Sequence, residues 1–108
     1  MKDYDSLVQG YLLKLQNGAK AQGIYIPKKI SFHERGRLSG KLLKTVSKIN
    51  KLVDRFSEEE LDQLILPHPI LGKLTIREML YFTIYHVQHH HNLTVKNLNQ
   101  KNKTLANF

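Results

Sequence analysis

Three Ser/Thr-x-x-Glu sequences constrain the fold of this chain more than any other feature. They pair Ser31 with Glu34, Ser57 with Glu60, and Thr75 with Glu78. In such a capping box the hydroxyl and the carboxylate satisfy free backbone amides in the first turn of a helix, so each pair predicts a helix start. The third start is the best marked, because Leu74 and Met79 occupy the two positions of a hydrophobic staple around it.

Apolar residues recur at helical spacing after these starts, and almost nothing alternates with a period of two. We therefore predict an all-α fold with long helices near residues 33–56 and 75–97, packed antiparallel. Short helices are predicted over residues 4–16 and 57–64, and the segment LPHPILGKLT, residues 66–75, is predicted to be a loop. The apolar stripe expected to pack in the first long helix contains Leu38, Leu42, Val46, Ile49, Val53 and Phe56.

The length of 108 residues allows one domain with a modest core. We expect a short helix and an extended connector over residues 1–30, a helical unit over residues 31–98, and a polar tail over residues 99–108. The last long helix is apolar on nearly every side between Met79 and Val87. This is more apolar surface than one copy of the chain is expected to cover. This predicts a symmetric homodimer, with the alternative that residues 1–30 fold back over the exposed face.

Composition excludes several kinds of chemistry. The chain has no cysteine, so disulfides, thiolate ligands and cysteine nucleophiles are excluded. No apolar stretch is long enough for a membrane span, and acidic residues occupy the N-terminus where a signal peptide needs basic ones, so we expect a soluble, cytoplasmic protein without a membrane partner. The formal net charge is +8, which permits attraction to nucleic acid but does not establish it.

A basic edge follows the first long helix, formed by Lys41, Lys44, Lys48, Lys51 and Arg55. A nucleic-acid-binding module would use such an edge, but no aromatic residues or recognition-helix signature accompany the charges. We therefore interpret the edge as a solvated helix face, with nucleic-acid binding as the less favoured alternative.

Four of the six histidines fall within HVQHHH, residues 86–91. The cluster is internal and interrupted, so it is no affinity tag. His86 and His90 are spaced i, i+4, which brings two imidazoles to one side of a helix and is the spacing by which a helix offers two nitrogen ligands to one metal ion. His89 and His91 point to the flanks and are poorer candidates.

Helical geometry places His90 on the stripe predicted to face the core, which contains Ile76, Met79, Thr83, Val87, His90 and Thr94. The alternative interpretation of the pair is a core histidine that is hydrogen-bonded to a neighbour. A zinc-protease mechanism is excluded, because Val87 stands where the HExxH motif requires glutamate.

The stretch HPILGKLTIREMLYFTIYHVQHHHNL, residues 68–93, resembles the C-terminal part of the DinB/YfiT-like superfamily, and the resemblance extends over roughly residues 30–98. The pattern HPxxGxLTxxEwxxFxxxHxxHH is matched by His68, Pro69, Gly72, Leu74, Thr75, Glu78, Phe82, His86, His89 and His90. The resemblance implies a four-helix bundle, often dimeric, in which three histidines hold a divalent metal, commonly zinc or nickel. Some members are thiol-dependent S-transferases or isomerases, and many have no known activity.

By position, the resemblance makes His86 and His90 the two metal ligands of the last helix. The family's third ligand comes from an earlier helix, whereas this chain has no histidine before His33. His33 and His68 are expected at helix ends, of order 15 Å or more from the pair, and Leu93 replaces a glutamine of the related HHxxQ pattern.

We therefore expect a truncated DinB-like bundle, completed by dimerisation, with weak residual binding of a divalent metal and no identified substrate or catalytic residue. A non-catalytic helical interaction or dimerisation module is the alternative.

Overall fold

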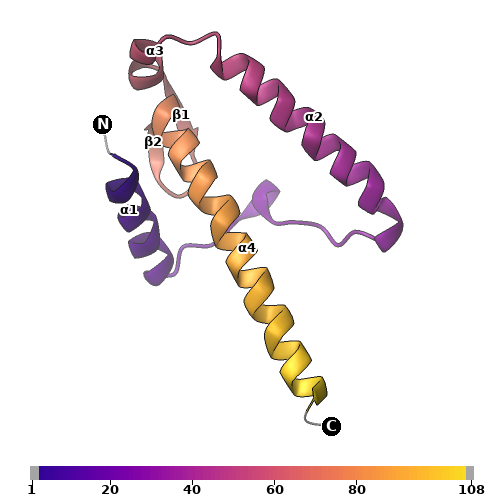
Figure 1. Cartoon of the computed structure of the whole chain (residues 1–108). Helices are drawn as coiled ribbons and strands as arrows, with labels where there is room; N and C mark the ends of the chain where they lie inside the picture. The colour runs from indigo at the N-terminus through magenta and orange to yellow at the C-terminus, as the bar shows by residue number, and fades with distance from the viewer. Residues whose placement is uncertain (1–2, 107–108) are drawn as a thin grey trace.

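The computed structural model describes the backbone of residues 3–106 and the side chains of residues 3–100. Its elements follow the chain in the order α1 Tyr4–Gln16, η1 Gly23–Tyr25, η2 Phe32–Glu34, α2 Arg35–Val53, α3 Glu58–Gln63, β1 Ile65–His68, β2 Gly72–Thr75 and α4 Ile76–Ala106. The two long and two short helices confirm the predicted all-α class, to which one small hairpin is added (Figure 1).

Two of the three predicted capping boxes form. At α3 the Ser57 hydroxyl accepts from the Glu60 amide while the Glu60 carboxylate accepts from the Ser57 amide. At α4 the Thr75 and Glu78 side chains bond reciprocally to each other's backbone amides at 2.9 and 3.1 Å. These bonds satisfy amides that have no intrahelical partner, which explains where both helices begin.

The capping box predicted at Ser31 is wrong. The Ser31 side chain makes no capping hydrogen bond, and the Glu34 carboxylate instead pairs with Arg37 one turn later. A short 3-10 turn precedes α2, which begins at Arg35 and ends at Val53, inside the predicted bounds of 33–56. At the other end of the chain, α4 continues through Ala106, beyond the predicted end at residue 97.

The predicted loop over residues 66–75 is a β-hairpin. Strands β1 and β2 pair antiparallel from Ile65 opposite Thr75 to His68 opposite Gly72. Gly72 has φ +79°, in the left-handed region that glycine adopts without a Cβ penalty, and this allows the tight return after Pro69. A further bond from the Ile76 amide to the Leu64 carbonyl, 3.0 Å long, ties the start of α4 to the end of α3.

The core lies where α1 and the hairpin pack against the first half of α4 (Figure 1). Its most buried apolar side chains are Leu7 and Tyr11 of α1, Leu61 of α3 and Leu74 of β2. The sequence predicts one apolar stripe for α1, and its residues Leu7 and Tyr11 are buried. The full predicted stripe is Leu7, Val8, Tyr11, Leu12 and Leu15. Arg77 of α4 adds a polar link to α3, because its guanidinium pairs with both Glu58 and Asp62.

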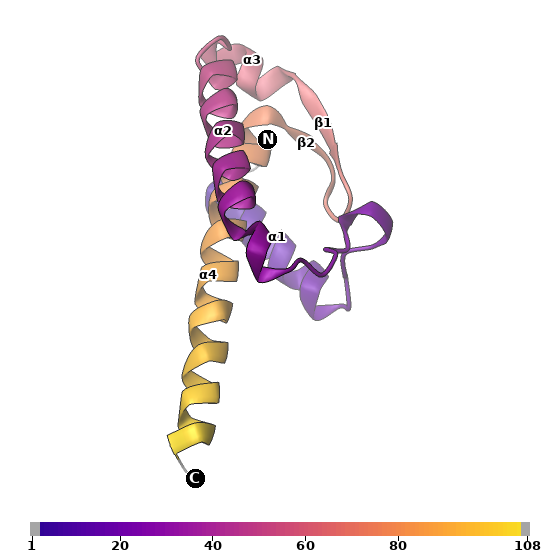
Figure 2. The ribbon, with the colours of Figure 1, turned by 90° about the vertical axis from the view of Figure 1, so that its right-hand side faces the viewer.

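The predicted antiparallel packing of the two long helices is wrong. Within residues 3–106, α2 packs only against the adjoining turn η2, and it lies apart from α4 in Figure 1. Figure 2 views the molecule from the side of α2, so α2 lies in front of the upper part of α4 and the gap seen in Figure 1 runs along the line of sight. No residue of α2 is buried, so its predicted packing stripe faces solvent in a single copy of the chain.

No helix within the described residues is both long enough and apolar enough to span a membrane.

Candidate functional site

A cavity of about 570 Å³ lies between α1, the connector that follows it, the β-hairpin and α4. Most of its wall is apolar or aromatic, and four of the chain's histidines line it. The residues that carry its chemistry are Tyr11, Lys20, His68, Phe82, His86, His89 and His90. A concave, mostly apolar site with a few convergent polar groups has the general form of a small-molecule or cofactor site.

His86 and His90 meet at the wall of this cavity. Their Nε2 atoms lie 3.0 Å apart and their rings are nearly perpendicular, at 85°. One neutral ring can donate a hydrogen bond to the other, and this bond by itself gives the pair a structural role. Two nitrogens 3.0 Å apart can also both lie about 2.0–2.1 Å from one cation, with an angle of about 94° at the metal. The separation of the two Nε2 atoms in the predicted i, i+4 pair is therefore compatible with two ligands to one ion.

The surroundings of His86 favour its neutral form. Its ring stacks on Phe82 with 4.9 Å between centroids, and Tyr11 lies edge-on at 6.2 Å. Partial burial lowers the pKa of His86, and the positive charges that His90 and His89 can carry lower it further. Because only an unprotonated imidazole nitrogen can bind a metal ion, the lowered pKa favours metal binding near neutral pH.

His68 lines the same cavity, so its predicted position far from the histidine pair is wrong. The hairpin runs back along α4 and brings the His68 ring to 4.3 Å from Phe82, one helical turn before His86. Burial lowers the pKa of His68, and the charge of His86 lowers it further. The P-x-x-G spacing of residues 69–72 was the available signal for a hairpin here.

The hydrogen bonds of His68 nevertheless disfavour it as a third metal ligand. Its Nδ1 atom accepts from the backbone amides of Ile70 and Leu71, at 3.1 and 3.0 Å. A neutral imidazole whose Nδ1 accepts carries its proton on Nε2, so neither nitrogen has a free lone pair. His68 therefore stabilises the hairpin turn and shapes the cavity wall.

The side of α4 that faces the core differs from the predicted stripe. His90 and Val87 are exposed, whereas His89 is half-buried, with Tyr11 edge-on to it at 6.4 Å and Tyr85 stacked on it at 5.8 Å. Tyr11 selects this face, because α1 docks over Phe82, Tyr85 and His89. His33 and His91 are exposed and lie outside the cavity.

The donor set within residues 3–100 is limited to the histidine pair. No group of three or more histidine, aspartate or glutamate side chains there is placed to hold a metal ion. The geometry thus fits a two-nitrogen site whose remaining positions would be filled by water or by groups from outside this set.

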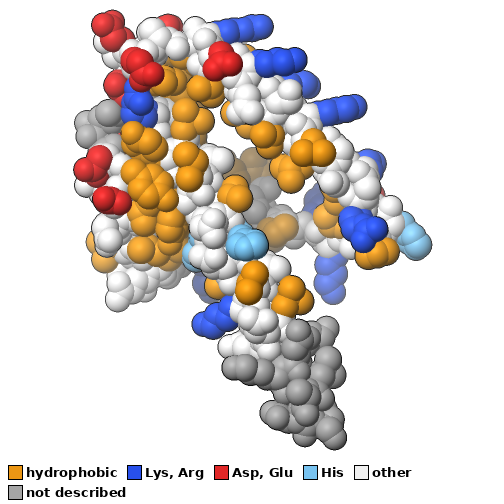
Figure 3. Space-filling view, viewed as in Figure 1, with side chains coloured by type: hydrophobic (Ala, Val, Ile, Leu, Met, Phe, Trp, Pro, Cys, Tyr) orange, Lys and Arg blue, Asp and Glu red, His pale blue; other side chains and the backbone are white. Residues whose placement is uncertain are grey.

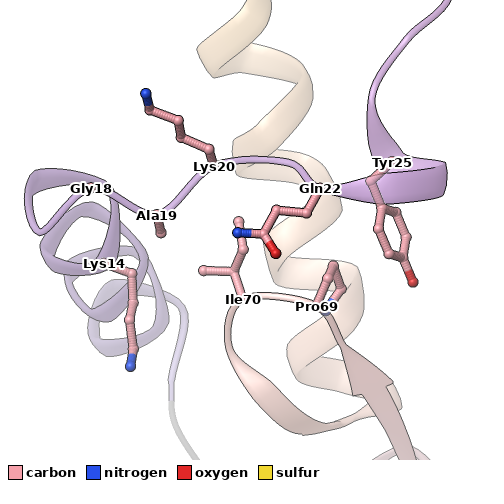
Figure 4. Close-up of a pocket in the computed structure, with 8 residues that line it drawn as sticks. All are labelled: Lys14, Gly18, Ala19, Lys20, Gln22, Tyr25, Pro69 and Ile70. Carbon is pink, nitrogen blue, oxygen red and sulfur yellow. The ribbon is translucent and has the colours of Figure 1, made fainter.

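A second, more open hollow of about 350 Å³ borders the cavity at the end of α1. Figure 4 shows that the ammonium groups of Lys14 and Lys20 point away from each other and from Gln22 at its centre. Divergent cations cannot enclose one anion, so this hollow has no anion-binding geometry.

The fold and the site thus define a mainly helical protein in which α1, the β-hairpin and α4 enclose a histidine-lined cavity, with an i, i+4 histidine pair on the last helix. The chain belongs to the DinB superfamily, whose sequence pattern matches residues 7–93. The match begins within α1, further upstream than the resemblance over residues 30–98 predicted, so α1 is part of the family unit. Searches of curated proteins and of solved structures found no match.

Proposed function

We propose that this DinB-superfamily protein binds a divalent metal ion weakly through His86 and His90 and acts as a homodimer. The observation that carries the metal site is the 3.0 Å separation of the two Nε2 atoms at the cavity wall. Imidazole ligands suit zinc and nickel. With two protein ligands the remaining positions would be held by water, which accounts for a weak site.

Bound there, a divalent ion would supply a Lewis acid at the edge of an apolar cavity. The chain's own contribution is to hold His86 against Phe82 and Tyr11, where its orientation is restricted. The aromatic wall would exclude water from one side of the ion and would receive the apolar part of a small molecule.

The site is tested by elemental analysis and calorimetric zinc titration of protein purified without a tag. We expect His86→Ala and His90→Ala each to remove most of the bound ion, because each deletes one of the two ligands. His91→Ala is the matched control, since His91 is an exposed neighbour in the same cluster and lies outside the cavity. Equal metal retention in all three variants would reject the assignment.

Self-association is supported by the uncovered apolar side chains of both long helices. A non-catalytic interaction module would use the same surfaces and would show the dimer without metal. The basic edge of α2 is exposed, so nucleic-acid binding is a less favoured alternative function. Such binding would give an affinity for duplex DNA that falls steeply as the salt concentration rises.

A further inference from the structure

The apolar side of α2 is uncovered through the middle of the helix. Leu42, Val46 and Ile49 are 64, 45 and 43 % exposed. Figure 3 shows that hydrophobic side chains of α2 face the open space between α2 and α4, while lysine and arginine side chains project from its outer edge. The helix therefore has the polarity of a packed bundle helix, with its apolar stripe turned inward and its charges turned outward. In the part of the chain that the structure describes, no other α-helix packs against it.

The side of α4 that faces away from α1 is uncovered as well. Ile84 and Val87 are 62 and 66 % exposed, and with Leu80 they follow each other at spacings of four and three residues. This spacing forms a continuous apolar stripe on a helix. One chain thus has two apolar helix faces, on α2 and on α4, and its own fold covers neither.

The chain is too open for a stable monomer of its size. Its accessible surface is 9337 Å², whereas a folded monomer of this mass exposes about 6,200 Å². Its radius of gyration is 17.1 Å, against about 13 Å for a compact chain of this length. Part of the excess lies on residues 91–100 of α4, which are all exposed. Even so, the difference exceeds the roughly 1,000–2,500 Å² that each subunit buries in an obligate dimer.

We propose that α2 of each chain packs between α2 and α4 of a second copy, so that two chains build one four-helix bundle by exchanging this helix. The proposal specifies the surfaces of the homodimer proposed above and rests on it. A two-fold axis makes the exchange reciprocal, and each α2 stripe would then meet the two apolar faces that a single chain leaves bare. The lysines of α2 would stay at the solvent edge of the bundle.

A second copy accounts for more of the surface than other partners do. Nucleic acid would engage the basic edge of α2 and leave its apolar stripe exposed. An acidic lipid surface would bury the stripe of α2 but leave Ile84 and Val87 of α4 exposed. Only a partner that carries helices with matching stripes covers both faces, and this chain itself carries such helices.

Cysteine crosslinking tests the exchange directly, because the chain has no native cysteine. Val46→Cys, on the α2 stripe, and Val87→Cys, on the outer face of α4, are made in separate chains, one of them lengthened by a tag. The two proteins are mixed, refolded together and treated with a short bismaleimide. We expect a crosslinked species that contains one chain of each kind, which cannot arise within a single chain.

Lys44→Cys is the matched control, because Lys44 lies on the basic edge of the same helix and is also exposed. It should give little crosslinking to Val87→Cys. If Val87→Cys crosslinks only to itself while sedimentation gives two chains, the dimer stands but the α2 exchange is overturned. If sedimentation gives one chain, both the dimer and the exchange are overturned. The zinc titration tests the metal site separately, so its result does not depend on whether the chain dimerises or exchanges α2.

A single charge provides a second test. Val46→Asp should convert a species of two chains into one of a single chain at micromolar concentration, because a buried carboxylate in the bundle would lack a partner. Lys44→Asp changes charge more strongly but should leave the mass of two chains intact. A single-chain wild type that binds anionic vesicles through α2 would overturn the exchange in favour of a lipid partner.

Discussion

The ring of His68 lies edge-on to the ring of Phe82, with 4.3 Å between the two centroids. This contact joins the turn of the β-hairpin to the middle of α4 and forms one wall of the cavity. His86 stacks on the same phenyl ring, so Phe82 contacts two histidines whose pKa values are both lowered. Protonation of either ring therefore acts on the packing of the hairpin against α4.

The free energy of unfolding should fall as the pH falls below about 6.5, the value of an unperturbed histidine. The pKa values of His68 and His86 are lowered in the folded chain, so between those values and about 6.5 the unfolded chain binds more protons. Stability then rises with pH through this window and is fully present above it. Urea unfolding midpoints at a series of pH values measure the effect.

The matched controls are His91→Gln and a His68→Asn variant. His91 is exposed, so its replacement should leave the pH dependence unchanged. Asparagine can accept the two turn amides through its side-chain oxygen but does not titrate, so His68→Asn should weaken the dependence. An identical pH profile for wild type and His68→Asn would show that His68 contributes nothing to it.

Tyr11→Ala should destabilise the fold by about 3 kcal/mol or more, a typical cost of deleting a buried aromatic ring. Tyr11 is 5 % exposed and contacts the rings of Phe82, Tyr85, His86 and His89, so it holds α1 against α4. Urea unfolding followed by circular dichroism checks this. Tyr25→Ala, at an exposed tyrosine, should cost about 0.5 kcal/mol or less, and equal costs would contradict the assigned role of Tyr11.

Gly72→Ala should cost about 1 kcal/mol, because an L side chain at φ +79° is strained. A Cβ at this position would meet no atom within 4 Å, so the cost is conformational and involves no clash. Gly72→Asn should lose less, since asparagine tolerates the left-handed region better than alanine does. Thermal unfolding of both variants measures the difference, and a more stable alanine variant would rule out strain as the cause.

Thr75→Ala should cost about 1 kcal/mol by deleting half of the capping box at the start of α4. The Thr75 hydroxyl accepts from the Glu78 amide at 3.1 Å, and this bond has no replacement in alanine. Thr94→Ala is the control, because its exposed hydroxyl bonds only to the His90 carbonyl one turn back. Chemical unfolding should separate the two variants, and similar midpoints would contradict the cap.

The sequence by itself determined where most helices lie. Caps and helical spacing act over a few residues, so the pairs Ser57–Glu60 and Thr75–Glu78 and the α1 stripe were sufficient to predict α1, α3 and α4. The same local reasoning predicted the contact of His86 with His90, because an i, i+4 pair meets on any helix. It failed at Ser31, where Glu34 bonds to Arg37 instead of the backbone.

Only the tertiary structure decided which faces of those helices are covered. Periodicity shows that α2 and α4 each have an apolar stripe, but burial depends on where another element docks. Docking of α1 through Tyr11 partly covers His89 and leaves His90 exposed, and α2 remains bare because no α-helix within residues 3–106 packs on it. The hairpin, which reverses the chain at Gly72, places His68 at the cavity. Such a contact between distant parts of the chain cannot be predicted from the spacing of residues along a helix.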